Sequence, residues 1–362
     1  MKFPQFRFHA ARSIDSRIAA WAWLGMSLAA FAGADVAAAA ATAMGMRQIA
    51  GMAADGPVTM YYPTHDEAKP TQAGRVTLQV AADGAPARGN GRLVVMSHGS
   101  GGAPWVHADL ARSLVEAGFI VAMPQHYADN YKDDSNPGPD SWKLRPAEVS
   151  RAIDAVARDA RFGPLLELDK VGAYGMSAGG HTVLTLAGGK WSPALFTQHC
   201  EAHLEEDFQS CVGLITRLTG GMFDGLKKWA ALKVLRSRFS DANLQAYTDP
   251  RIAAVVAGVP SSADFDMSSF AHVRVPLGLV TARQDQWLHP RFHSDRVLAA
   301  CPSCEVIADL PTAGHGALLS PLPPGFTGLL GDMLNDPPGF DRGSMAEVNG
   351  KITAFFVRHL AP

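Results

Sequence analysis

One serine of this chain lies in a sequence that could make it a nucleophile. Ser177 is the centre of a G-x-S-x-G pattern that runs from Gly175 to Gly179. The pattern follows a short apolar run at residues 171–174 and precedes a stretch that reads as a helix to about Leu186. Between a strand and a helix, such a turn is sharp, and its glycines remove Cβ atoms that would collide with the flanking elements. This placement favours a nucleophile over an ordinary glycine-rich turn.

A serine hydroxyl needs a base within hydrogen-bond reach, and the base needs a carboxylate to fix its tautomer. His315, between Gly314 and Gly316, follows the last apolar run of the chain and is the predicted base. Asp285 follows the run at residues 275–281 and lies between serine and histidine in chain order, so it is the predicted acid. Asp264, which follows the preceding strand, is the alternative.

The same chemistry requires two backbone N–H groups to hold an oxyanion. Ala178, directly after the nucleophile, is expected to supply one of them. The second is expected from Ser100 or Gly101, in the glycine turn after residues 93–97. A glycine turn of this kind can also bind phosphate, but neither G-x-x-x-x-G-K-[ST] nor G-x-G-x-x-G with its later acid is present.

Alternating strand-like and helix-like segments must position these residues. Apolar runs at 93–97, 119–123, 171–174, 252–259, 275–281 and 305–309 predict strands, and helices are predicted at 104–117, 146–161, 293–299 and 346–359. Strand–helix alternation in this order predicts an α/β fold with a mostly parallel central sheet and helices on both faces. Residues 130–141 and 321–343, rich in Pro and Gly, are predicted to be loops.

The alternation stops at Lys190 and resumes near residue 252. Residues 190–248 have helical texture and are too long for a plain connection, so we predict an inserted helical cap. The cap holds several large apolar side chains that could line an acyl pocket or form the cap's own core: Trp191, Leu195, Phe196, Phe208, Phe223 and Trp229.

The first 41 residues resemble a secretory signal peptide. A positive start is followed by an apolar run at residues 18–34 and an alanine-rich stretch with A-x-A sites. The alternative is an uncleaved membrane anchor, although the run is short and holds Gly25, Ser27 and Gly33. We expect residues 42–362 to form the mature domain, located in the periplasm or secreted, with no stable membrane insertion once the signal is removed.

The four cysteines suit an oxidising compartment. Because they form two close pairs in sequence, disulfides Cys200–Cys211 and Cys301–Cys304 are the simplest connectivity. A redox role for Cys301-Pro302-Ser303-Cys304 is disfavoured, because the motif follows a helix and precedes a strand rather than the reverse. Zinc ligation is disfavoured because nothing else has ligand spacing.

Charge and composition exclude some partners. The chain of 362 residues has a net charge of −2 and contains no nucleic-acid-binding motif, so nucleic acid is not an expected partner. Its length, less the signal peptide, suits one large α/β domain. Oligomeric state does not follow from these features.

Three segments together resemble a known family. His98-Gly99-Ser100-Gly101-Gly102, the phrase from Leu144 to Asp154 (LRPAEVSRAID), and the elbow with Gly180 are similar to the predicted dienelactone hydrolases of exported bacterial proteins. That group is itself similar to platelet-activating-factor acetylhydrolases and polyester hydrolases. The resemblance implies an α/β-hydrolase fold, a triad of Ser177, Asp285 and His315, and no metal or organic cofactor.

The sequence also departs from that family. Dienelactone hydrolases resemble a cysteine-nucleophile enzyme, whereas this chain has Ser177, so dienelactone is not carried over as the substrate. Met176 replaces the histidine that usually precedes the nucleophile. The acetylhydrolase relatives tend to use the earlier aspartate, which keeps Asp264 open. We expect a serine carboxylesterase acting on a small-molecule or polymeric ester; a peptidase with the same triad and a catalytically silent scaffold are the alternatives.

Overall fold

The computed structural model describes residues 42–52, 54–323 and 325–360. The predicted signal peptide lies outside these residues. Among the helices that are described, none is both long and apolar enough to cross a membrane.

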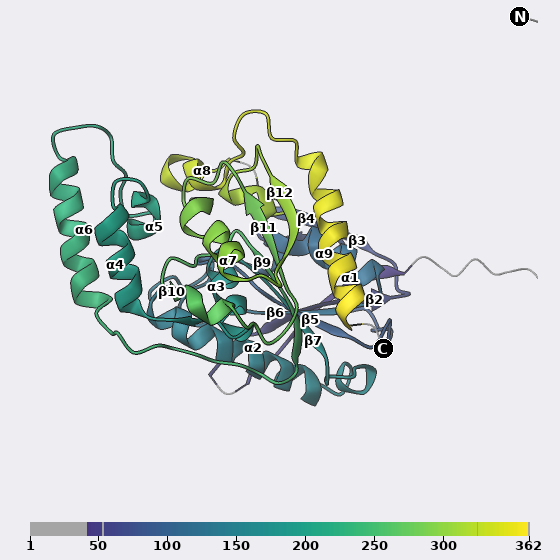
Figure 1. Ribbon diagram of the computed structural model, residues 1–362. Helices are drawn as coiled ribbons and strands as arrows, with labels where there is room; N and C mark the ends of the chain where they lie inside the picture. Colours follow the sequence, from purple (N-terminus) through teal and green to yellow (C-terminus); the bar gives the residue numbers. More distant parts are fainter. Residues whose placement is uncertain (1–41, 53, 324, 361–362) are drawn as a thin grey trace, which may run out of the picture. The chain divides into compact units, whose positions relative to one another are not determined.

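The described residues form one large twisted sheet in the order β12-β11-β9-β7-β5-β6-β2-β1-β4-β3 (Figure 1). Strands β6, β5, β7, β9, β11 and β12 run parallel, while β2 pairs antiparallel with both β6 and β1. The strands of this sheet are β1 (Ala43–Ile49), β2 (Val58–Thr64), β3 (Lys69–Ala73), β4 (Val76–Ala82), β5 (Leu93–Ser97), β6 (Ile120–Pro124), β7 (Val171–Met176), β9 (Ile252–Gly258), β11 (Leu277–Ala282) and β12 (Glu305–Leu310). The carboxyl ends of the parallel strands meet at one edge, where polar side chains from distant parts of the chain can converge.

Helices cover both faces of this sheet because the parallel strands are apolar on both sides. One face packs against α1 (Ala108–Glu116) and α9 (Met345–Leu360), which lie side by side in Figure 1. The other face packs against α2 (Asp140–Arg158), α3 (Ala178–Leu186) and α7 (Ser294–Ala300). Each face therefore has its own core, and the predicted mostly parallel α/β architecture is confirmed.

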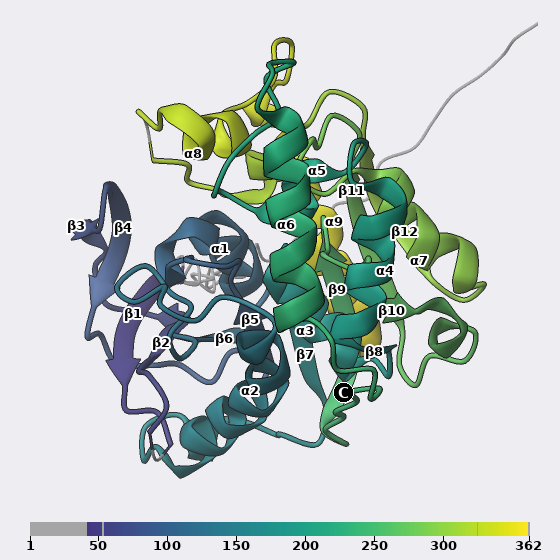
Figure 2. The same cartoon turned by 90° about the vertical axis from the view of Figure 1, so that its left-hand side faces the viewer.

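Three helices lie between α3 and β9. They are α4 (Pro193–His203), α5 (Phe208–Val212) and α6 (Asp224–Arg238), and α6 is the outermost of them (Figure 2). The two ends of this helical segment are hydrogen-bonded to each other, because Trp191 in β8 (Lys190–Trp191) exchanges two backbone hydrogen bonds with Gln245. β8 also pairs with β10 (Phe265–Asp266), which follows β9. The start of this helical segment is thus hydrogen-bonded both to its end and to β10, just after β9 of the central sheet.

Both disulfides join the cysteines that are close in sequence. Cys200 in α4 is bonded to Cys211 in α5, and Cys301 is bonded to Cys304 just before β12. The first connects two helices of the inserted segment, and its sulfurs lie among Phe196, Leu204 and Phe208. The predicted pairing is confirmed.

Two helices differ from the sequence prediction. Helix α2 begins at Asp140 rather than Pro146, so Pro146 lies inside the helix instead of at its start. The added turn is held by tertiary bonds, since the Ser141 hydroxyl and the Arg145 guanidinium both donate to the Asp129 carboxylate. The segment 321–343, expected to be a loop, contains α8 (Gly328–Leu334).

Candidate active site

Ser177 lies on a strained turn between β7 and α3. Its φ of 58° and ψ of −119° are unusual for a residue with a side chain. A Cβ atom at Gly175 would lie 2.0 Å from the Gly179 carbonyl oxygen, and one at Gly179 would lie 1.9 Å from the Ser97 carbonyl oxygen. Both glycines are therefore required by backbone contacts, as the G-x-S-x-G pattern predicts. The turn places the serine at the N-terminal, positive end of α3.

The structure brings His315 and Asp285 together with this serine. His315 Nε2 lies 3.1 Å from Ser177 Oγ, and His315 Nδ1 lies 2.7 Å from Asp285 Oδ2. The other carboxylate oxygen accepts backbone N–H bonds from Trp287 and Leu288 at 2.8 and 2.9 Å. Ser177 follows β7, Asp285 follows β11 and His315 follows β12, so all three come from the carboxyl edge of the sheet.

Asp264, the alternative acid, is bonded to a different histidine. Its Oδ2 lies 2.9 Å from Nε2 of His181 in α3, and both side chains are buried. The His181 ring is enclosed by Trp142, Trp191 and Phe265. In this arrangement Asp264 is engaged away from His315, and Asp285 is the carboxylate that contacts the imidazole next to Ser177.

The candidate oxyanion residues differ in whether their backbone N–H groups already have a hydrogen-bond partner. Ala178 is the first residue of α3, so its N–H has no partner within the helix. The Gly101 N–H donates to Asp129 Oδ1 at 3.1 Å, so the expectation that Gly101 could supply an oxyanion donor is corrected. Gly101 has a left-handed φ of 65°, a conformation that favours glycine at this place in the turn. The Ser100 N–H donates no hydrogen bond within the part of the chain that the structure describes.

Gly99 is a neighbour of the nucleophile that the sequence analysis did not single out. A Cβ at Gly99 would lie 3.5 Å from Ser177 Cβ and 3.9 Å from Ser177 Oγ. Any side chain at this position would therefore stand directly beside the Ser177 hydroxyl. The signal for it is its place in the glycine turn, two residues after β5.

Behind this turn lies a buried polar network that the sequence analysis also missed. Arg145 and Asp129 form an ion pair at 2.7 Å with no solvent exposure of either side chain. Beside them, His126 Nε2 lies 2.8 Å from Ser97 Oγ, and His126 Nδ1 lies 2.6 Å from the Glu148 carboxylate. Burial lowers the pKa of His126, and burial raises the pKa of Glu148. Asp129 could have been suspected because it follows β6 at the same sheet edge.

The aromatic side chains of the inserted segment do not form one pocket wall. Trp191 packs in the core beneath the sheet, and Phe196 and Phe208 pack in the segment's own small core. Phe223 and Trp229 are 65% and 59% exposed. Of these five aromatic residues, Phe196 and Phe208 therefore agree with the second expectation, that they form the cap's own core.

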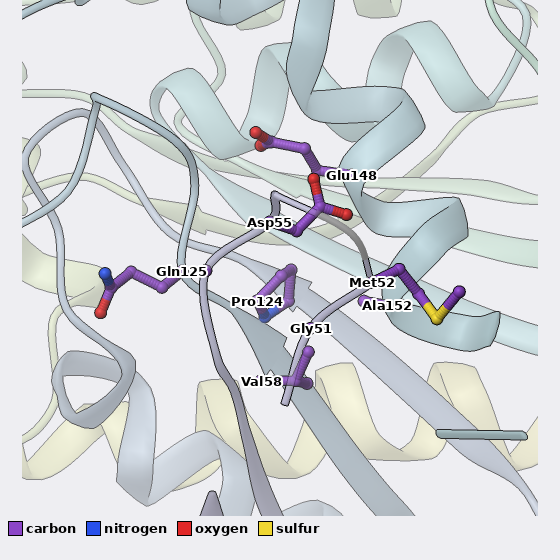
Figure 3. A pocket seen from close by; sticks show the side chains of 9 residues that line it. Gly51, Met52, Asp55, Val58, Pro124, Gln125, Glu148 and Ala152 are labelled. Carbon is purple, nitrogen blue, oxygen red and sulfur yellow. The ribbon is translucent and has the colours of Figure 1, made fainter. Parts of the chain in front are cut away.

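A shallow hollow elsewhere on the molecule is separate from the triad. It is lined by Gly51, Met52, Asp55, Gly56, Val58, Pro124, Gln125, Glu148 and Ala152 (Figure 3). None of Ser177, Asp285 and His315 contributes to it, so we do not assign substrate binding there. In the described part of the chain, no group of three His, Cys, Asp or Glu side chains is arranged to hold a metal ion.

Comparison with known proteins adds one match. The model of the dienelactone hydrolase family matches residues 80–196, a range that includes the glycine turn, Arg145 and Ser177 but neither Asp285 nor His315. No curated protein matches the chain. The similarity to that family over residues 80–196, together with the sheet order and the elbow, shows an α/β-hydrolase fold and indicates a hydrolase.

Proposed function

We propose that this protein is an exported serine esterase that cleaves carboxylic esters through an acyl-enzyme on Ser177. The observation that carries the proposal is the unbroken chain of contacts from Ser177 Oγ through His315 to Asp285. It is supported by the strained elbow and by the family match, which reaches Ser177. The two disulfides are compatible with export to the periplasm or beyond it.

In the proposed reaction, His315 Nε2 takes the Ser177 proton as the serine oxygen attacks the ester carbonyl. Asp285 holds the imidazole in the tautomer with the proton on Nδ1 and stabilises its charged form. The N–H groups of Ala178 and Ser100 hold the oxyanion of the tetrahedral intermediate. Collapse transfers the proton from His315 to the leaving alcohol, and the acyl group stays on Ser177. Water, activated by His315, then releases the acid and restores the serine.

The test is hydrolysis of p-nitrophenyl esters from acetate to palmitate by residues 42–362, compared with a Ser177→Ala variant. We expect turnover that is lost in the variant, and the chain-length optimum reports the size of the acyl site. A fluorophosphonate probe should label the wild-type protein and not Ser177→Ala, because only an activated serine reacts quickly.

The outcomes separate the alternatives. Neither turnover nor labelling would overturn the proposal and favour a catalytically silent scaffold that binds a partner. Labelling without ester turnover, combined with cleavage of peptide substrates, would favour a peptidase that uses the same triad. Turnover that persists in Ser177→Ala would exclude Ser177 as the nucleophile.

A further inference from the structure

The phrase LRPAEVSRAID has no role in the hydrolytic mechanism above, yet its second residue is buried directly behind the active-site turn. Arg145 is one turn and a half into α2 and has no exposure to solvent. Burying a guanidinium is costly, and a buried ion pair is often no more stabilising than well-packed apolar residues of similar volume. Its contacts therefore require an explanation other than stability.

Arg145 donates to the carbonyl oxygens of the turn that passes Ser177. Nη1 donates to the His98 carbonyl at 2.6 Å, and Nη2 lies 3.4 Å from the Gly99 carbonyl. Nη2 also donates to the Asp129 carboxylate at 2.7 Å. The guanidinium thus holds the His98 peptide group closely and shares the Gly99 carbonyl with His98 Nδ1 at 2.7 Å and the Gly102 N–H at 3.0 Å.

Asp129 holds the next two residues of the same turn. Its Oδ1 accepts from the Ser100 hydroxyl at 2.5 Å and from the Gly101 N–H at 3.1 Å. Its Oδ2 accepts from Arg145 and from the Ser141 hydroxyl. Burial alone would raise the pKa of Asp129, but the Arg145 charge and these hydrogen bonds outweigh burial and lower the pKa.

Peptide geometry turns these carbonyl contacts into an orientation of N–H groups. In a planar trans peptide, the carbonyl of one residue and the N–H of the next point in opposite directions. Because Arg145 holds the His98 carbonyl, the Gly99 N–H must point away from α2. The Gly99 carbonyl, which sets the direction of the Ser100 N–H, is held by Arg145 together with His98 Nδ1 and the Gly102 N–H. Neither N–H donates a hydrogen bond within the described residues, and the position of a Gly99 Cβ is 3.9 Å from Ser177 Oγ.

We propose that Arg145, itself oriented by Asp129, is a positioning residue: it fixes the peptide plane of the Gly99 N–H and, with His98 and Gly102, that of the Ser100 N–H, so that both N–H groups face the developing oxyanion. The inference rests on the proposed serine hydrolase function. It assigns to the Arg145–Asp129 pair an effect on the transition state rather than on substrate affinity. Removing one oxyanion donor lowers kcat by about 10²- to 10³-fold in known cases, and misplacing the donors should cost part of that.

The test compares Arg145→Lys and Arg145→Met with Arg151→Met. Arg151 is a matched control because it lies on the same helix and is also paired with an aspartate, Asp55, through two hydrogen bonds. We expect the Arg145 variants to lower kcat for a short-chain ester by about 100-fold with KM changed less than about threefold. They should weaken binding of a boronic acid analogue, whose adduct places an oxygen in the hole, by a similar factor. Arg151→Met should leave both values unchanged.

Thermal unfolding of each variant separates misfolding from misplacement. Should the Arg145 variants fail to fold, Ser100→Ala serves as the milder variant, because it removes one bond from the turn to Asp129 and keeps the Ser100 N–H. Its kcat should fall about threefold to tenfold, again without a matching rise in KM. Folded variants whose kcat and analogue affinity equal those of Arg151→Met, or a loss confined to KM, would overturn this inference alone. Absence of Ser177-dependent turnover in the wild type would overturn the proposed function and the inference with it.

Discussion

Two buried imidazole–carboxylate pairs lie close to the same elbow, and they differ in what the second ring nitrogen meets. In the pair of His315 and Asp285, the free nitrogen lies 3.1 Å from Ser177 Oγ. In the pair of His181 and Asp264, the second nitrogen has no hydrogen-bond partner among the described residues, and aromatic rings enclose the imidazole. The distances within the two pairs are nearly equal, 2.7 and 2.9 Å.

The comparison shows that pairing a histidine with an aspartate does not by itself make a catalytic base. Asp285 is further held by two backbone N–H groups, whereas Asp264 Oδ1 has no partner among the described residues. The first pair is fixed from the loop after β11 and faces a hydroxyl. The second pair joins α3 to the segment after β9, and we assign it to stability. The first three predictions below test this division.

The largest effect is expected for His315→Gln. Without a base, Ser177 cannot be deprotonated during attack, and kcat for a p-nitrophenyl ester should fall by about 10⁴-fold or more. The control is His181→Gln, assayed at a temperature where it remains folded, and its kcat should stay within about threefold of the wild type. A comparable kcat loss in both variants would remove the distinction between the pairs.

Asp285→Asn should lower kcat by about 10⁴-fold, because an amide cannot stabilise the charged imidazole and favours the wrong tautomer. Asp264→Asn should have little effect on kcat measured on folded protein. A large loss at Asp264 alone, with Asp285→Asn near normal, would reverse the assignment of the triad acid.

For stability, unlike for kcat, the larger loss is expected from variants of the His181–Asp264 pair. His181→Leu leaves the Asp264 carboxylate buried and unpaired, and the free energy of unfolding should fall by about 3–5 kcal/mol. The double variant His181→Leu/Asp264→Leu should recover part of this loss, since no buried charge remains. Denaturant unfolding measures both. A single variant as stable as the wild type would show that the pair is not needed for the fold.

Another buried histidine, His107, pairs with no carboxylate among the described residues, and its protonation should make stability depend on pH. Burial lowers the pKa of His107 to about 4; Nδ1 contacts the Leu318 carbonyl, and Nε2 has no partner among the described residues. Between pH 6.5 and 4 the unfolded chain binds a proton that the folded chain does not, so stability falls as pH falls through this window. Protonation of His107 alone should account for about 3 kcal/mol of the unfolding free energy lost between these pH values. In His107→Gln, the loss of stability between pH 7 and 4 should be smaller by about this amount; equal losses would contradict the prediction.

The sequence could predict site residues that depend on local contacts or on the order of the strands. The glycines around Ser177 are required by contacts within the elbow, and Asp285 and His315 follow strands whose ends share one edge. The role of Gly101 could not be predicted, because it depends on where Asp129, on another loop, directs an amide. The same holds for Arg145, whose contacts arise only when α2 packs behind β5. Phe223 and Trp229 are apolar yet exposed, and residue type alone could not tell them from the buried Phe196 and Phe208.

The way the triad is divided along the chain has a consequence for its assembly. Ser177 and His315 are 138 residues apart, and the histidine follows β12, the last strand at its edge of the sheet. A growing or refolding chain can form the elbow, β5 and α3 long before any base reaches the serine. Hydrolytic activity therefore requires that β12 has joined the sheet. During refolding, the appearance of activity should mark the arrival of the C-terminal strand rather than the formation of the elbow.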